Sequence, residues 1–167
     1  MVLVNFFKNL AELELSVEQA RVELADLYDF EPFAAFNRVD GDKNKKIYTM
    51  DIYDFLMENG RNSYSVKDVQ LMMQFYDLDN SGSLGYTEFM KFILPCDNAE
   101  LREEVCQRKT FEVDNKNGKK LHETVETGLA DFFERELAVH MRLEMLKYQL
   151  FKCHDWNSET GFELLDS

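Results

Sequence analysis

The sequence has few residues that interrupt helices or cross-link a chain. It contains two prolines, seven glycines and three cysteines in 167 residues. The cysteines at positions 96, 106 and 153 lie far apart, are odd in number and include no C-x-x-C pair. A disulfide-stabilised scaffold is therefore not expected, and a reducing compartment fits better.

Long apolar runs and targeting signals are also missing. No uncharged apolar stretch approaches the length that spans a membrane. The first fifteen residues lack the basic region and the small-residue cleavage site of a secretory signal. The sequence therefore predicts no membrane span and a cytoplasmic location.

Basic residues are scarce relative to acidic ones. There are 19 Lys and Arg against 32 Asp and Glu, which gives a net charge of −13. Nucleic acid and anionic membranes would repel such a chain, so neither is expected as the main partner. The charge suits a protein that binds cations, although solubility alone also favours excess acid. With 45% hydrophobic and 13% aromatic residues, the chain can still form a core.

Apolar residues recur at spacings of three and four, which predicts an all-α fold. The first run extends from Leu3 to Val17 and continues through Leu24, and Ser16 with Gln19 resembles a capping box where a helix would restart. A second capping box is expected at Asp97 and Glu100. The later predicted helices are Pro32–Val39, Met50–Asn59, Val66–Tyr76, Tyr86–Ile93, Asn98–Lys109 and a long one from about His122 to Cys153.

The segment from Asp77 to Glu88 reads Asp-Leu-Asp-Asn-Ser-Gly-Ser-Leu-Gly-Tyr-Thr-Glu between two predicted amphipathic helices. Calcium prefers six to eight oxygen ligands, and a twelve-residue loop supplies them from positions 1, 3, 5, 7, 9 and 12, with glycine at position 6. A plain Asp- and Ser-rich surface turn is the alternative. This segment resembles the loop of the EF-hand superfamily, the calmodulin- and centrin-like proteins. The predicted calcium ligands are side-chain oxygens of Asp77, Asp79 and Ser81, the Ser83 carbonyl, and both carboxylate oxygens of Glu88.

Five further residues have expected roles in or beside this loop. Gly82 would make the turn, and Leu84 would pair with a neighbouring loop. A water would fill the position of Gly85. Phe75 and Phe89, which flank the loop, are expected to pack its two helices together.

The resemblance implies a partner loop, and Asp40–Asp51 begins 37 residues earlier. Asp40, Asp42, Asn44, Lys46 and Asp51 occupy its ligand positions, and Ile47 corresponds to Leu84. Lys45 stands where glycine is expected, at a cost of roughly 1 kcal/mol for a positive φ. The shorter Asp at the closing position lowers the expected calcium affinity and favours Mg²⁺. This loop is expected to be a weak or empty site that pairs with the stronger one.

The chain also shows an internal repeat at a distance of 126 residues. Leu3–Asp40 aligns with Leu129–Asp166 without a gap, with eight identities in 38 positions. Shared helical bias could produce such a number by itself. If the repeat is real, the chain ends on the first residue of another loop and is one piece of a longer helical array.

Other candidate sites are weaker. Asp114–Gly118 resembles a loop start but has no closing carboxylate, and a turn is expected there. Asp155–Asp166 has acids at both ends, yet the repeat makes Asp155 a helix start and Asp166 a first ligand. The three histidines are scattered, and no Ser/His/Asp arrangement or phosphate loop occurs. The chain is therefore not expected to be an enzyme.

The predicted organisation is a helical segment over 1–30, a pair of EF-hands over 31–95 and a helical extension over 96–167. The long helix has two apolar stripes, so it must be covered on two sides, by the pair itself, by a neighbouring repeat or by a protein partner. The apolar stripes consist of Leu129, Phe132, Phe133, Leu137, Met141 and Tyr148, and of Leu143, Leu146 and Leu150.

Two functions are consistent with these features. One is a calcium-responsive protein-interaction module, in which methionines 50, 57, 72, 73 and 90 line an exposed groove or lie in the core. The other is a constitutive structural scaffold, and a simple calcium buffer is less favoured. The segment Leu94-Pro95-Cys96-Asp97 resembles multi-EF-hand cytoskeletal or ciliary proteins of protists, which implies a cytoskeletal or ciliary setting.

Overall fold

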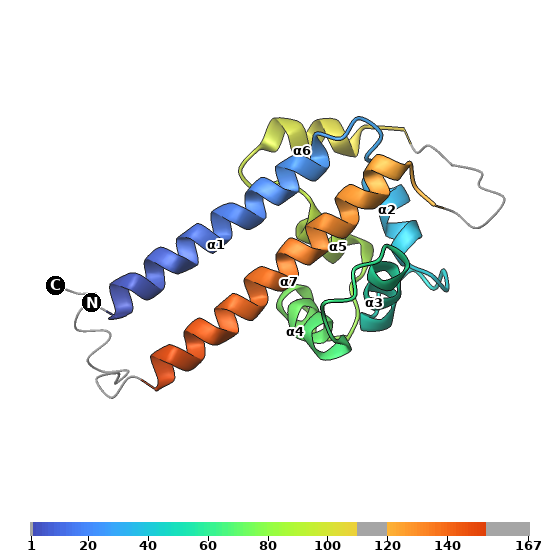
Figure 1. Ribbon diagram of the computed structural model, residues 1–167. Coiled ribbons are helices and arrows are strands. Elements are labelled where there is room, and N and C mark those ends of the chain that lie inside the picture. The colour runs from blue at the N-terminus through green and yellow to red at the C-terminus, as the bar shows by residue number, and fades with distance from the viewer. Residues whose placement is uncertain (1, 110–119, 153–167) are drawn as a thin grey trace.

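The computed structural model describes residues 2–109 and 120–152, and in these ranges the chain is entirely helical apart from its loops. Two long helices lie side by side and run in opposite directions, with the short helices packed mainly along one side of the second (Figure 1). The elements are α1 (Val2–Ala25), α2 (Pro32–Val39), α3 (Thr49–Glu58), α4 (Val66–Tyr76), α5 (Tyr86–Ile93), α6 (Ala99–Cys106) and α7 (Glu123–Phe151).

Contacts at the end of α1 and the start of α7 explain how closely the long helices approach. A Cβ atom on Gly128 would come within 2.6 Å of the end of the Leu27 side chain, so any other residue here would require that leucine to move. About two turns further along α7, Arg135 forms an ion pair of 2.7 Å with Glu23. The end of α1 therefore lies beside the first turns of α7.

Local sequence signals set the limits of several short helices. Glu31 caps α2 by accepting hydrogen bonds of 2.8 Å from the N–H groups of Phe33 and Ala34, and Pro32 fills the first helical position. Ser65 caps α4, with its side chain accepting a hydrogen bond from the Asp68 N–H. Pro95 follows the end of α5, where a helix could not continue.

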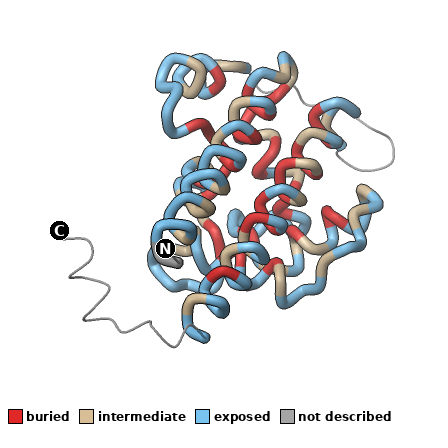
Figure 2. The backbone as a smooth tube through the Cα atoms, turned by 60° about the vertical axis from the view of Figure 1, so that its left-hand side comes forward, coloured by how far each residue is buried: buried red, intermediate tan, exposed pale blue. Residues whose placement is uncertain are grey.

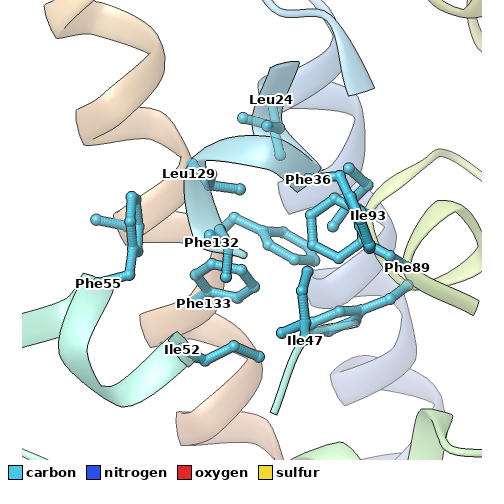
Figure 3. Close-up of a cluster of buried hydrophobic side chains, with 14 of the residues drawn as sticks. Leu24, Phe36, Ile47, Ile52, Phe55, Phe89, Ile93, Leu129, Phe132 and Phe133 are labelled. Carbon is cyan, nitrogen blue, oxygen red and sulfur yellow. The ribbon is translucent and has the colours of Figure 1, made fainter. Parts of the chain in front are cut away.

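The core lies where α7 crosses the short helices. Phe132 and Phe133 of α7 stack against Phe92 of α5, with ring centroids 5.2 and 5.6 Å apart. Phe133 also contacts Phe55 of α3 at 5.8 Å. All four rings are almost completely buried. Figure 2 shows buried backbone where the helices face one another, and Figure 3 shows Phe55, Phe132 and Phe133 within the apolar cluster. We call the surface of the short helices that includes Phe55 of α3 and Phe92 of α5 the apolar face. In this chain, Phe132 and Phe133 of α7 cover it.

Three details differ from the sequence-based expectations. Helix α1 runs without a break past Ser16, because its apolar stripe continues along α7. Helix α6 begins at Ala99 and is shorter than predicted, since Asn98 and not Asp97 accepts the capping hydrogen bond. Phe75 is 65% exposed, so of the two flanking phenylalanines only Phe89 packs into the core.

The predicted methionine set and apolar stripes are divided between core and surface. Met72 and Met73 are buried, whereas Met50 and Met57 are about half exposed. Along α7 the stripe is buried from Leu129 to Leu137 but exposed at Met141 and Tyr148. No helix among the described residues is long and apolar enough to cross a membrane.

Candidate metal centre

The second loop, residues 77–88, connects α4 to α5 and gathers three carboxylates. Asp77 is the C-terminal cap of α4, and Glu88 lies in the first turn of α5. One oxygen from each of Asp77, Asp79 and Glu88 lies within 4.8 Å of the other two. Three negative charges at this separation repel one another unless a cation or several N–H donors offset them.

Backbone N–H groups hold these carboxylates in place. Asp77 accepts hydrogen bonds from the N–H groups of Ser81 at 2.9 Å and Gly82 at 2.8 Å. The two oxygens of Glu88 accept from Leu78 and from Gly85, each at 2.9 Å. Glu88 thus joins the start and the end of the loop, and its side chain is already turned toward the other acids.

Glycine is required at the centre of this turn. Gly82 has a φ of +79°, a conformation that side chains rarely adopt. Asn80 also has a positive φ, of +56°, which asparagine tolerates better than most residues. The tight turn points the N–H groups of residues 81 and 82 inward, toward Asp77.

The serines complete a set of oxygen atoms. The Ser81 hydroxyl donates to the carbonyl of Ser83 at 3.0 Å, and hydrogen bonds from Ser81 lower the pKa of Asp79. Asp79 is therefore ionised at neutral pH. The five predicted ligands lie on one short loop, and the three acids among them converge. Carboxylate, hydroxyl and carbonyl oxygens are the ligands that hard cations such as Ca²⁺ prefer.

The two loops pair through a short antiparallel bridge. Ile47 and Leu84 exchange backbone hydrogen bonds of 2.9 and 2.8 Å, and both side chains are fully buried. This pairing between residues 47 and 84 follows the sequence-based expectation. It fixes the first loop, residues 40–51, beside the second.

The first loop repeats the backbone pattern of the second. Asp40 accepts hydrogen bonds from the N–H groups of Asn44 and Lys45, at 3.2 and 2.8 Å. Asp51 accepts from Tyr48 at 2.7 Å, as Glu88 does from Gly85. Lys45, in the place of Gly82, has a φ of +67°. The polypeptide therefore follows the same path even where a lysine replaces glycine.

The acids of the first loop do not converge as those of the second do. The carboxylate cluster found among the described residues contains no member of 40–51. Burial raises the pKa of Asp51, and the charges of Asp42 and Asp40 raise it further. Asn44 donates to Asp42 at 2.8 Å and accepts from the Lys46 N–H at 2.9 Å. The shorter side chain of Asp51 reaches less far into the loop than Glu88 does.

A buried polar network that the sequence did not reveal lies directly behind the second loop. The hydroxyl of Tyr76, the residue before Asp77, contacts both carboxylate oxygens of Glu136 on α7 at 2.9 and 3.0 Å. Arg21 of α1 donates to the Phe92 carbonyl on α5 at 2.8 Å and reaches Glu136 at 3.5 Å. The only signal in the sequence was an acid, Glu136, inside the apolar stripe of α7.

This network shifts the pKa values of its members. Burial raises the pKa of Glu136 to about 7, against the opposing effects of Arg21 and the Tyr76 hydroxyl. Burial lowers the pKa of His140, which lies 3.6 Å from Glu136, to about 4. Burial also raises the pKa of Tyr76, so its hydroxyl stays protonated and can donate.

The segments 114–118 and 155–166 lie outside the described residues.

Comparison of the chain with protein-family models, with curated proteins and with solved structures found no match.

Proposed function

We propose that this chain is a calcium-binding EF-hand protein that acts as a calcium-responsive protein-interaction module. Its strong site is the second loop, 77–88, and its degenerate site is the first loop, 40–51. The observation that supports this most directly is the convergence of Asp77, Asp79 and Glu88 on a glycine-centred loop between two helices. The bridge between Ile47 and Leu84 adds the loop pairing that EF-hands use.

Calcium at the second loop would supply the positive charge that three neighbouring carboxylates lack. Asp77, Asp79, Ser81, the Ser83 carbonyl and Glu88 would hold it. The chain's own contribution is to present these oxygens together, through the N–H groups that orient Asp77 and Glu88. Mg²⁺ is the more suitable ion for the first loop, where the closing acid is shorter.

The loop is mechanically connected to both long helices. Tyr76, next to the first ligand, is hydrogen-bonded to Glu136 on α7. The carbonyl of Phe92, on the same helix α5 as Glu88, accepts a hydrogen bond from Arg21 on α1. A change in the angle between α4 and α5 would therefore disturb contacts with α1 and α7. This connection is the route by which calcium would alter the surface offered to a protein partner.

A structural scaffold is the second candidate, and one observation favours it. Helix α7 already covers the apolar face, with Phe132 and Phe133 fully packed. A calcium sensor must release or shift α7 when calcium binds, whereas a scaffold leaves α7 in place. A cytoskeletal or ciliary assembly would then be the setting of a constitutively bound ion.

Calorimetric calcium titration with hydrophobic-dye fluorescence distinguishes the two functions. We expect micromolar binding with dye uptake in the wild type, and both lost in Glu88→Gln. The matched control is Glu104→Gln on α6, which lies outside both loops and should bind as the wild type does. Binding without dye uptake would favour the scaffold, and no binding by the wild type would contradict the proposed calcium site.

A further inference from the structure

The two long helices have the same sequence pattern but different surroundings. At the offset of 126 residues, Leu3, Phe6 and Phe7 of α1 correspond to Leu129, Phe132 and Phe133 of α7. The helices also end in the same register, because α1 ends at residue 25 and α7 at residue 151. The two helices therefore end at matching positions, although α7 begins at residue 123, five residues before the counterpart of Val2.

In α7 these residues have a defined role. Phe132 and Phe133 are at most 2% exposed and stack on Phe92 of the apolar face (Figure 3). Leu129 is completely buried beside them. The Leu-x-x-Phe-Phe motif is thus the part of α7 that covers a helix–loop–helix pair.

The corresponding segment of α1 is more exposed. Phe7 is 43% exposed, against 0% for its counterpart Phe133, and Val4 is 69% exposed where Ala130 is 1%. Phe6, the counterpart of Phe132, is half-buried. Figure 2 shows the backbone beside the N-terminus as mainly exposed or intermediate. The first half of α1, residues 4–15, thus has no buried residue and leaves the phenylalanine that matches Phe133 accessible.

The second halves of the two helices show the reverse relationship. In α1, Glu18 and Arg21 form an i,i+3 ion pair at 3.4 Å. Glu18 also accepts from the N–H groups of Cys96 and Asp97, just after α5. The matching residues Glu144 and Lys147 of α7 form the same i,i+3 pair at 2.8 Å but remain more than half exposed. The second half of α1 is therefore engaged with the segment that follows α5, whereas Glu144 and Lys147 of α7 face solvent beside the buried Leu146.

We propose that the first half of α1 is a docking surface for the apolar face of a second helix–loop–helix pair of this kind. The occupant is specified by α7, whose identical motif already binds such a face. In the resulting arrangement, two neighbouring units share one long helix. The first half of this helix covers the apolar face of the preceding helix–loop–helix pair, and its second half packs against the following pair. The inference goes beyond the calcium-dependent function, because it rests on apolar packing and does not require metal.

A two-unit chain tests this directly. Residues 1–128 are joined to residues 3–167, so that α1 of the second unit stands in the register of α7 for the first and Gly128 is kept. The second unit keeps the chain intact from residue 3. Lys91→Arg, an exposed substitution, marks the first unit so that its peptides around Phe92 can be distinguished by mass. Hydrogen exchange of these peptides then reports whether the first unit's apolar face is covered.

We expect protection around Phe92 in the first unit to lie within about threefold of that in the single chain. Phe6→Glu with Phe7→Glu at the junction should reduce it by roughly 100-fold, because two charges cannot be buried on the apolar face. In the single chain the same pair should leave protection around Phe92 unchanged, since Phe6 and Phe7 lie away from it.

A further control shows that a two-unit chain can fold. Residues 1–151 joined to 26–167 place α7's own sequence at the junction, and its first unit should be protected as in the single chain. The proposal is overturned by one combination of results. In it, Phe92 of the first unit is protected from exchange in this control, but the chain joined through α1 shows no more protection there than its Phe6→Glu/Phe7→Glu variant. If neither junction protects the first unit, sharing of a long helix is overturned as well. Parallel runs with calcium and with a chelator keep this outcome separate from that of the calcium site.

Discussion

Individual residues in the two loops differ in backbone conformation and in side-chain length. Gly82 and Lys45 occupy matching positions with φ values of +79° and +67°. Only the glycine adopts this conformation without steric cost. Glu88 and Asp51 both accept a hydrogen bond from the N–H three residues earlier, but only Glu88 joins a cluster of acids. The two closing acids differ by one methylene, and the proposed difference in ion affinity between the loops rests on this and on Lys45.

Replacing Gly82 tests the conformational requirement. A Cβ atom there meets nothing within 4 Å, so Gly82→Ala acts through the backbone alone. We expect a loss of about 1 kcal/mol in the free energy of unfolding, together with weaker calcium binding. Urea denaturation and calorimetry measure the two effects. Gly41→Ala is the matched control, because its Cβ would make only an ordinary contact 3.7 Å from Asp51; an equal loss in both would contradict the argument.

Lengthening the closing acid of the first loop tests the explanation of its weakness. Asp51→Glu should add a second calcium-binding event, because the longer carboxylate reaches the other acids as Glu88 does. Calorimetry should show the stoichiometry rising from one to two. Asp54→Glu, an exposed change on the same helix, should leave it at one. An unchanged stoichiometry in Asp51→Glu would place the defect elsewhere, for example at Lys45.

At the scale of elements, α7 is the helix that packs against most of the others. It contacts α1, α3 and α4, and its buried stripe alternates apolar rings with charged groups that have partners. Glu126, buried at one end, binds Arg38 of α2 at 2.8 Å, and Glu136 binds Tyr76 of α4. Removing Arg38 would leave the buried Glu126 without its arginine partner, which is costly, and removing Tyr76 would leave Glu136 with Arg21 as its remaining charged partner.

Matched phenylalanine truncations compare the two long helices. Phe133→Ala should cost about 3–5 kcal/mol of unfolding free energy, because it leaves a cavity in a packed core. Phe7→Ala, at the repeat-equivalent position of α1, should cost less than about 1 kcal/mol, since that ring is 43% exposed. Chemical denaturation of the single chain checks both. Similar losses would mean that α1 and α7 are packed alike, against the structure.

Glu136 and His140 are both buried, and their shifted pKa values make the free energy of unfolding depend on pH in opposite directions. The pKa of Glu136 is raised to about 7 in the folded state. Its contribution to the free energy of unfolding is therefore greatest below its unfolded-state pKa and is lost as the pH rises toward 7. His140 has a pKa lowered to about 4, so its contribution is present above its unfolded value and is lost as the pH falls toward 4.

Single variants separate these contributions. In Glu136→Gln the free energy of unfolding should rise as the pH increases from about 4 to 6.5, because only the histidine effect remains. In His140→Gln it should fall as the pH increases from about 4.5 to 7. Urea denaturation across this range measures both slopes. The same slope in both variants would show that neither group is responsible.

At the scale of the whole molecule, one continuous core connects the long helices to the loops. Buried residues from α1 to α7 belong to a single cluster, which includes Ile47 and Leu84 of the paired loops. Phe36 packs on Phe89 at 5.4 Å and thereby joins the first helix–loop–helix to the second. The described parts of the chain should therefore unfold together.

Calcium should stabilise this whole unit and not the loop alone. At a free concentration one hundred times the dissociation constant, linkage gives about 2.7 kcal/mol of additional unfolding free energy. Thermal unfolding followed by far-ultraviolet circular dichroism, which reports on all helices, should shift as one transition. Glu88→Gln should show no shift. Two transitions, with only one sensitive to calcium, would contradict a shared core.

Much of the local structure was predictable from the sequence. The limits of α2, α4 and α5 followed from Pro32, Ser65 and Pro95, because caps and prolines act within one helical turn. The pairing of Ile47 with Leu84 followed from their common position in the two loops. The continuity of α1 past Ser16 was not predictable, since packing on α7 overrides a weak local capping signal.

The sequence by itself determined the all-helical class and the set of acids in the second loop, because these depend on spacing over a few residues. It also contains the eight identities between Leu3–Asp40 and Leu129–Asp166 on which the proposed repeat rests. Only the tertiary structure decided which copy of Leu-x-x-Phe-Phe is buried, because both helices have the motif and the choice depends on where the chain folds back. It likewise decided the network of Arg21, Tyr76 and Glu136, whose members come from three helices far apart in the sequence. Burial of such polar groups depends on partners that no local pattern specifies.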